Sequence, residues 1–199
     1  MLLYENEQSG NCYKVRLVLA YLGVDYERRQ LEVNDRSNRR EVLGHLNPAL
    51  RVPTLVLDDG RALPESNAII WYLAQDTALV PSDPFVHAQM LQWMFFEQYD
   101  HEPAIAVVRY MRHISGRPED FADRLPELER KGYAVLDAME GHLADRVYFV
   151  GDGLTLADVA LYAYTHVAPE GGFSLDAYPA IRRWLARVAD QPGHVPINA

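Results

Sequence analysis

Patterns typical of β-strands are almost confined to the first third of the chain, and this asymmetry limits the folds that the chain can adopt. Beyond two closely spaced prolines, Pro81 and Pro84, apolar residues recur almost only at helical spacing. A mixed α/β part is therefore followed by an all-helical part. The 199 residues are expected to form one domain over residues 1–76, a linker at 77–84 and a second domain over residues 85–199.

The N-terminal part begins with a strand–helix–strand pattern. Apolar runs predict strands at residues 1–4, 26–33, 52–57 and 61–63. A helix is predicted over Cys12–Leu22, with Gly23 placed to end it, and a short one at residues 40–46. Two strands separated by one helix form a parallel pair with a right-handed crossover. The run Asp58-Asp59-Gly60 predicts a hairpin between the last two strands.

The C-terminal part is predicted to consist of helices over residues 85–111, 126–143 and 179–189, together with one that follows Thr155. Pro103 should bend or interrupt the first of them. Thr155 and Asp158 have the spacing of a capping box, in which the third helical residue bonds back to the N-cap. This part is therefore expected to be all-α.

Charge and cysteine content exclude several classes of protein. The formal net charge of −9 argues against binding nucleic acid or an anionic membrane, because both require clustered Lys and Arg. The single cysteine, Cys12, excludes an intrachain disulfide and favours a cytoplasmic location. We find no secretory signal, and no apolar run reaches the roughly 18 residues of a spanning helix. No metal site has convincing ligand spacing.

Three short motifs in the N-terminal part could together hold a peptide-like ligand. Pro53 opens a strand. If the Val52–Pro53 bond is cis, the main chain of Val52 can pair with an extended peptide. If the bond is trans, Pro53 is an ordinary edge-strand proline. Glu65 and Ser66 precede a helix, where N–H groups attract a carboxylate and Glu65 can accept from an ammonium. Their alternative role is helix capping.

Ser9 is the third motif, because it follows the first strand at the sheet edge where ligands of α/β proteins bind. A hydroxyl donor there, next to the start of a helix, would stabilise a thiolate. A free thiol has a pKa of about 8.5, and each unit by which that pKa falls corresponds to about 1.4 kcal/mol of stabilisation of the thiolate relative to the thiol. Ser9 could also cap the helix, or do both.

Together these motifs resemble the glutathione transferases. Ser9-Gly-Asn-Cys-Tyr-Lys-Val-Arg16 and Leu22-Gly-Val-Asp-Tyr-Glu27 are similar to the opening of that family. Asn47-Pro-Ala-Leu-Arg-Val-Pro-Thr-Leu55 and Leu63-Pro-Glu-Ser-Asn-Ala-Ile-Ile-Trp-Tyr-Leu73 resemble its glutathione-binding block, and Gly151-Asp-Gly-Leu-Thr-Leu-Ala-Asp158 resembles its C-terminal capping motif. The resemblance covers nearly the whole chain. It implies a thioredoxin-like N-terminal domain, an all-helical C-terminal domain and a homodimer in the cytoplasm.

The resemblance also implies roles for individual residues. Ser9 would hydrogen-bond the glutathione sulfur, Val52 would pair with the cysteinyl main chain beside a cis Pro53, and Glu65 and Ser66 would hold the γ-glutamyl end. The remaining implied contacts are Arg51 in place of the usual lysine, Asn38 or Arg39 near the glycine carboxylate, Glu97 reaching the partner subunit's glutathione, and Arg109 and Tyr110 beside the second substrate. Leu50 replaces the glycine that usually precedes the basic residue at position 51 in this family.

The group that contacts the sulfur remains open among Ser9, Asn11 and Cys12. Aligning on Lys14-Val15-Arg16 puts Asn11, not Cys12, at the cysteine of the zeta-type isomerases, which argues against that activity. The primary expectation is an enzyme that activates glutathione for attack on an electrophilic or peroxide substrate. The alternatives are a glutathione-dependent disulfide oxidoreductase acting through Asn11 or Cys12, and a non-enzymatic binding module with the same fold.

Overall fold

The computed structural model describes residues 1–199 and divides the chain into two compact units. The N-terminal unit contains residues 1–75 together with residues 192–199, and the helical unit contains residues 76–191. The last eight residues therefore belong to the N-terminal unit, whereas the sequence patterns assigned them to the helical domain.

The N-terminal unit is built on a four-stranded sheet with the order β2-β1-β3-β4. Its strands are β1 (Leu2–Glu5), β2 (Glu27–Gln30), β3 (Thr54–Val56) and β4 (Ala62–Pro64). β1 and β2 are parallel, as the strand–helix–strand pattern predicts. β3 runs antiparallel to both β1 and β4, which confirms the predicted hairpin.

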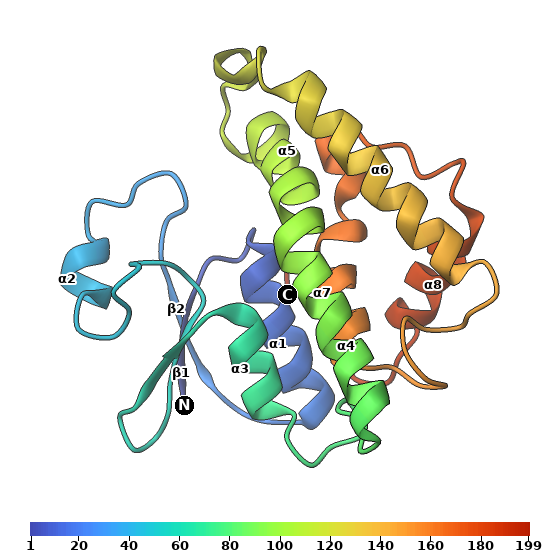
Figure 1. Ribbon diagram of the computed structural model, residues 1–199. Helices are drawn as coiled ribbons and strands as arrows, with labels where there is room; N and C mark the ends of the chain where they lie inside the picture. The colour runs from blue at the N-terminus through green and yellow to red at the C-terminus, as the bar shows by residue number, and fades with distance from the viewer. The chain divides into compact units, whose positions relative to one another are not determined.

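Three helices accompany this sheet: α1 (Gly10–Leu22), α2 (Arg39–Leu43) and α3 (Ser66–Leu73). Figure 1 shows α1 and α3 on one face of the sheet and α2 on the other. α1 begins where the Ser9 side chain accepts a hydrogen bond from the N–H of Cys12, and it ends at Gly23 in the left-handed conformation with φ 63°. Leu3, Leu17 and Leu55 are fully buried in the core of this unit.

The register of the sheet brings three loops to one edge. Tyr4 of β1 lies opposite Thr54 of β3, and Thr54 lies opposite Pro64 of β4. This row stands at the end of β1, the start of β3 and the end of β4. The loops carrying Ser9, Val52–Pro53 and Glu65 therefore leave the sheet side by side.

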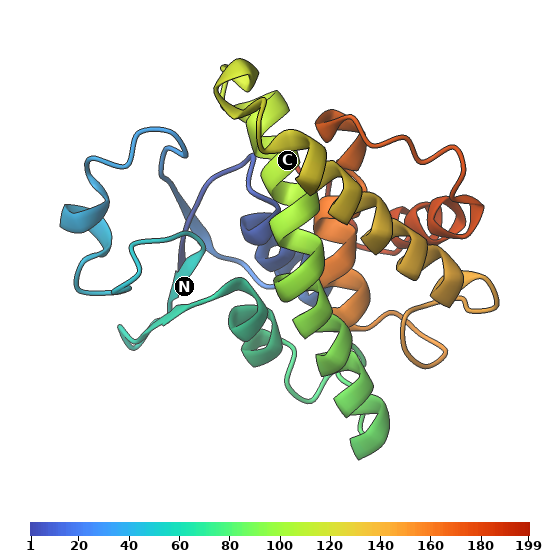
Figure 2. The ribbon, with the colours of Figure 1, turned by 45° about the horizontal axis from the view of Figure 1, so that its top comes forward.

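One long helical run dominates the second unit (Figure 2). It comprises α4 (Pro84–Phe96), the π-helical η1 (Glu97–Ala106), α5 (Val107–Arg109) and the π-helical η2 (Tyr110–Ile114). The α-helix predicted over residues 85–111 is interrupted by η1, and Pro103 lies inside this π-helical segment. The wider π-helical turn there accommodates a residue that lacks an N–H group.

The other helices of this unit are η3 (Pro118–Phe121), α6 (Leu125–Leu143), α7 (Leu156–Thr165), η4 (Ala168–Gly171) and α8 (Pro179–Ala189). The helical run packs against both α6 and α7, and α8 packs against α6 and α7. The predicted all-helical architecture is therefore confirmed. No helix combines the length and the apolar character that crossing a bilayer would require.

A buried carboxylate fixes the start of α7. Asp158 is fully buried and accepts hydrogen bonds from the N–H and hydroxyl of Thr155, at 2.9 and 3.0 Å, which confirms the predicted capping box. It also accepts from the N–H of Phe149 at 3.0 Å and from the indole N–H of Trp184 at 2.9 Å. Burial raises the pKa of Asp158, while these four donors oppose that rise. One side chain thus ties the start of α7 to α8 and to the loop before it.

We expect Asp158→Ala to lower the free energy of unfolding by about 3–5 kcal/mol, because it leaves four buried donors without an acceptor. Urea unfolding followed by circular dichroism measures this loss. Asp152→Ala, which removes an exposed carboxylate from the same loop, should change stability by less than about 0.5 kcal/mol. Equal losses in the two variants would show that the network around Asp158 does not stabilise the fold.

Candidate functional site

The loop between β1 and α1 is fixed by Asn6 and presents Ser9. The carboxamide of Asn6 donates to the carbonyl of Leu31 at 3.0 Å and accepts from the N–H of Gln8 at 3.0 Å. The N–H of Ser9 donates to the carbonyl of Asn6 at 3.1 Å. The hydroxyl oxygen of half-buried Ser9 accepts from the N–H of Cys12 at 3.3 Å, and its own hydrogen is used by no acceptor in the protein. Ser9 therefore caps α1 and still has a donor to offer.

The second loop contains a cis peptide bond between Val52 and Pro53, as the resemblance to the glutathione transferases implies. Asn47, which is only 2% exposed, holds this loop: its amide donates to the carbonyl of Arg51 at 2.9 Å and to the hydroxyl of Thr54 at 3.0 Å. The N–H and C=O of Val52 make no hydrogen bond within the chain. They are free to pair with an extended ligand beside the first residue of β3.

Leu50 adopts a conformation that usually favours glycine, with φ 54°. Its side chain packs against the cluster formed by Tyr4, Leu31 and Leu43. Its carbonyl accepts a hydrogen bond from the guanidinium of Arg39 at 3.4 Å. The cost of this backbone conformation is thus offset by an apolar contact and a polar one, which explains how leucine replaces the glycine expected there.

The third loop ends at Glu65, which occupies the N-cap position of α3; the helix itself begins at Ser66. This corrects the expectation that Ser66 caps the helix. Glu65 is exposed and has φ 74°, a strained conformation for a residue with a side chain. Such strain at an exposed carboxylate beside a helix start is typical of a binding site.

A hydrogen-bonded bridge joins the starts of α1 and α3. The hydroxyl of Ser66, 3% exposed, donates to the side-chain oxygen of Asn11 at 3.2 Å. The fully buried ammonium of Lys14 donates to the same hydroxyl at 3.4 Å and to the side-chain oxygen of Asn67 at 3.3 Å. The two loops that the sequence singled out thus meet, and a positive charge lies beneath them.

Cys12 lies in the core rather than at the site surface. Its side chain is fully buried, and its sulfur accepts a hydrogen bond from the N–H of Asn6 at 3.3 Å. Burial raises the pKa of the Cys12 thiol to about 11, although Ser9 and Asn6 act in the opposite direction. A thiol of this kind does not present a nucleophile at neutral pH, so the structure argues against Cys12 as a catalytic group.

The residues expected near a glycine carboxylate differ in exposure. Asn38 and Arg51 are exposed, whereas Arg39 is 5% exposed and donates to the carbonyl of Glu32 at 2.6 Å as well as to that of Leu50. The Nε of Arg39 is buried without a hydrogen-bond partner. Burial lowers the pKa of Arg39, and neighbouring Arg36 lowers it further. No carboxylate of the chain pairs with the guanidinium of Arg39. The surroundings of Arg39, with Asn38 before it in the sequence and Arg51 next to its partner Leu50, therefore favour the binding of an anion.

Glu97 is fully buried in this chain, and its contact with a ligand of a partner subunit stays a prediction. Asp100, three residues further along η1, is the exposed carboxylate on this stretch of helix. Arg109 is 4% exposed and paired with Glu170 at 2.6 Å, so its charge is already engaged. Tyr110 is partly buried, with its ring centroid 6.3 Å from that of Phe121.

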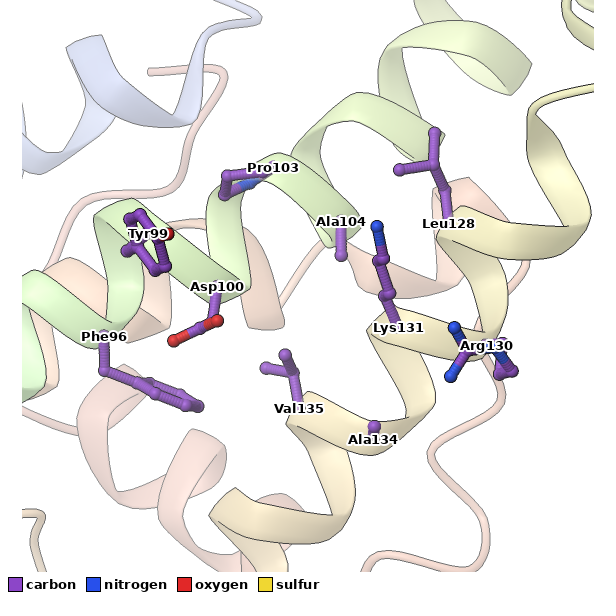
Figure 3. A pocket seen from close by; sticks show the side chains of 10 residues that line it. All are labelled: Phe96, Tyr99, Asp100, Pro103, Ala104, Leu128, Arg130, Lys131, Ala134 and Val135. Atoms are coloured by element: carbon purple, nitrogen blue, oxygen red, sulfur yellow. The ribbon is translucent and has the colours of Figure 1, made fainter.

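The helical unit has a pocket of about 580 Å³ along the helical run and α6. Figure 3 shows Phe96, Tyr99 and Asp100 on the helical run, facing Lys131 and Val135 on α6. Apolar and charged side chains of both signs are therefore combined in one groove. The exposed aromatic residues of this helical run are Phe85, Phe95 and Tyr99, with exposures of 72%, 69% and 83%.

Sequence reasoning missed the residues that support the site. Asn47 was included in the segment that resembles the glutathione-binding block but was given no role, although a polar residue within a loop of a binding motif is a recognisable signal. Lys14 had no such signal, because a lysine in a helical pattern is normally exposed. Lys14 donates to Ser66 and Asn47 donates to Arg51, so both support residues that are expected to touch a ligand.

The fold and the site define a class of protein: a thioredoxin-like domain with a cis-proline loop, followed by an all-helical domain. A family profile described as "Glutathione S-transferase, N-terminal domain" matches residues 8–76, and one described as "Glutathione S-transferase, C-terminal domain" matches residues 86–192. The chain belongs to the glutathione S-transferase family.

Two solved structures illustrate the structural similarity. A glutathione S-transferase from Pseudomonas fluorescens is 45% identical, with 98% of each chain covered and a TM-score of 0.94. The yeast prion protein Ure2p, in complex with glutathione, is 25% identical, with 96% of this chain and 95% of that chain covered and a TM-score of 0.86. The fold is thus shared with proteins of which at least one binds glutathione.

Two curated relatives differ in length and function. Maleylacetoacetate isomerase from Pseudomonas aeruginosa is 32% identical, over 96% of this chain and 92% of its own length. Elongation factor 1-gamma from Artemia salina is 27% identical over 95% of this chain, and the chain spans only 44% of its length. The family therefore includes proteins with different activities.

The burial and raised pKa of Cys12 predict that it resists alkylation. In the native protein at pH 7.5, iodoacetamide should modify Cys12 at least about a hundredfold more slowly than in urea-unfolded chain, because the thiol is both shielded and almost fully protonated. Mass spectrometry after quenching measures the rate. Cys12 is the only cysteine, so the label count is unambiguous. Rapid labelling of folded protein would return Cys12 to the candidate nucleophiles.

Proposed function

We propose that the chain binds glutathione at the edge of its N-terminal sheet and activates the glutathione thiol for attack on an electrophilic or peroxide substrate. The observation that carries this proposal is the row formed by Tyr4, Thr54 and Pro64, from which three loops with unused polar groups emerge. These groups are the hydroxyl hydrogen of Ser9, the main-chain N–H and C=O of Val52, and the carboxylate of Glu65. Their chemistry matches a tripeptide thiol.

The main chain of Val52 is the natural partner of the cysteinyl residue. Its N–H and C=O would form two hydrogen bonds with an extended peptide that continues the sheet beyond β3. The γ-glutamyl ammonium would pair with Glu65, and the γ-glutamyl carboxylate would lie at the start of α3, above Ser66 and the Lys14 charge. The glycine carboxylate would lie toward Arg39, with Asn38 and Arg51 on its exposed side.

Ser9 would then be left beside the sulfur. Its oxygen already accepts from the N–H of Cys12, so its hydrogen can be donated to the thiolate. The N-terminus of α1 favours the same negative charge. Both effects lower the pKa of the bound thiol and raise the fraction of thiolate at neutral pH. Asn11 stays a second candidate donor, because it lies on the same turn and contacts Ser66.

The activated thiol serves more than one reaction. Transfer to an electrophile is the expected chemistry, with Tyr110 as a candidate contact of the second substrate and Arg109 available only if its pair with Glu170 opens. Isomerisation is a second candidate, because the 32% identity to maleylacetoacetate isomerase covers nearly all of both chains. An assay of maleylacetoacetate isomerisation beside assays of arylation and peroxide reduction separates these reactions.

We also propose that the protein forms a homodimer through the groove of Figure 3. Exposed Tyr99 and half-buried Phe96 supply apolar surface there, and Asp100 lies in the same groove as Arg130 and Lys131. Around a twofold axis each copy presents the same patch, so acidic and basic side chains of one copy can meet their opposites on the other. This patch is therefore suited to a second copy of the chain.

Ser9→Ala should raise the pKa of enzyme-bound glutathione by about one unit or more, because one charge-assisted hydrogen bond to the thiolate is lost. Ultraviolet titration of the thiolate in the glutathione complex measures this pKa. Ser174→Ala, which removes an exposed hydroxyl from the helical unit, is the matched control and should leave the titration unchanged. An unaltered pKa in Ser9→Ala would exclude Ser9 from the mechanism.

Two further measurements test the alternatives. If isothermal titration calorimetry of the wild-type protein detects no heat of glutathione binding, the non-enzymatic module is favoured. If the wild-type protein reduces a mixed disulfide and Cys12→Ser does not, the oxidoreductase is favoured.

Tyr99→Asp should weaken the homodimer by at least about tenfold in dissociation constant, because it places a charge at an apolar contact beside Asp100. Sedimentation velocity across a dilution series measures the change. Val147→Asp is the control, since Val147 is 50% exposed in the loop after α6 and does not line the groove. A wild-type protein that sediments as a monomer at every concentration would contradict the proposal.

A further inference from the structure

Arg16 connects three parts of the N-terminal unit that are far apart in sequence. It lies on α1, is 3% exposed, and pairs with the fully buried carboxylate of Glu5 at 3.3 Å. Its second terminal nitrogen donates to the carbonyl of Glu7 at 3.0 Å and to the carbonyl of Ile197 at 2.5 Å. One guanidinium thus links the end of β1, the loop that leads to Ser9, and the C-terminal tail, residues 192–199.

The tail has its own attachments to the N-terminal unit. The hydroxyl of Tyr13 donates to the carbonyl of Val195 at 2.7 Å, and Arg28 donates to the main-chain oxygen of Ala199 at 2.8 Å. Gly193, the second residue of the tail, has φ 81°, and a Cβ atom at this position would lie 3.3 Å from the carbonyl oxygen of Ala20. The tail is therefore fitted to α1 along its length rather than trailing from the last helix.

The peptide groups of Glu7 are held from both sides. Its N–H donates to the side-chain oxygen of Gln30 at 3.1 Å, and the amide of Gln30 donates to Glu5 at 3.0 Å. Its carbonyl is held by Arg16. Ser9 follows two residues later in the same loop.

We propose that Arg16 and the C-terminal tail form a brace that positions Ser9 for thiol activation. Arg16 is a positioning residue: the tail carbonyl of Ile197 and the carboxylate of Glu5 orient its guanidinium, and the guanidinium fixes the carbonyl of Glu7. The inference rests on the proposed role of Ser9. A hydroxyl that moves by a fraction of an ångström loses its hydrogen bond to the thiolate, whereas Val52 and Glu65, on other loops, still bind the peptide.

Arg28 provides a matched comparison. It also pairs with Glu5 and also donates to the tail, at Ala199, but it does not contact the loop that carries Ser9. A general loss of stability would follow from removing either arginine. Release of Ser9 should follow only from removing Arg16.

The test compares Arg16→Met, Arg16→Lys and Arg28→Met in the full-length protein. In Arg16→Met, glutathione-conjugating activity at pH 6.5 should fall at least about fivefold and the pKa of the bound thiol should rise, while KM for glutathione changes less than about twofold. Arg16→Lys should recover part of the loss, because one ammonium reaches some but not all of the three acceptors. Arg28→Met should keep the wild-type thiol pKa.

Amide hydrogen exchange supplies a readout independent of activity. Exchange at residues 7–9 should accelerate in Arg16→Met and in Gly193→Val, which displaces the tail at its start, but not in Arg28→Met. If both changes act through one brace, the double variant Arg16→Met/Gly193→Val should lose little more activity than Arg16→Met alone. Additive losses would overturn the role of the tail.

The outcomes separate this inference from the proposed function. If Ser9→Ala raises the pKa of bound glutathione but Arg16→Met does not, the brace is refuted and the role of Ser9 stands. If Ser9→Ala has no effect on that pKa, the role of Ser9 fails and positioning for thiol activation fails with it. Unchanged exchange at residues 7–9 in a folded Arg16→Met protein refutes the brace by itself.

Discussion

The side-chain amide of Asn47 is the interaction on which the candidate site depends. Both of its functions are satisfied inside one loop: the nitrogen donates to Arg51 and Thr54, and the oxygen accepts from the N–H of Ala49 at 2.9 Å. Because Thr54 belongs to the row that crosses the sheet, this amide ties the loop to the strands. The residues on either side of Val52 are thus held by Asn47, while the main chain of Val52 itself makes no hydrogen bond within the chain.

Unfavourable local features are concentrated at the same edge of the sheet. Leu50 and Glu65 have positive φ angles, and Arg39 is buried with one donor unsatisfied. Such features cost of order 1–3 kcal/mol each and persist only where the surrounding structure enforces them. In the helical unit, by contrast, the buried carboxylate of Asp158 has all of its hydrogen-bonding needs met by four donors. The strained and unsatisfied groups named here therefore lie at the proposed glutathione site, whereas Asp158 stabilises the helical unit.

The elements predicted from the sequence are those that depend on local signals. The order of strands and helices, the hairpin at Gly60 and the capping box of Thr155 and Asp158 follow from spacing alone. The π-helical turns of η1 do not, because spacing does not distinguish them from α-helical turns. Within this stretch Glu97 is buried and Asp100 is exposed. Arg16 and Asn47 act through contacts with distant main chain, which periodicity does not record.

The hydroxyl of Ser9 alone can account for much of the proposed thiol activation. A hydrogen bond to a charged acceptor contributes about 1.5–3 kcal/mol, which corresponds to a fall of about one to two units in the thiol pKa. The start of α1 adds about 0.3–1 kcal/mol. From a free value of about 8.5, these effects bring the thiol close to neutral pH without any second charged group at the sulfur. The activation is then limited by how accurately Ser9 is held, because hydrogen bonds weaken steeply away from linear geometry. A site of this kind therefore needs a well-supported loop more than it needs additional polar residues.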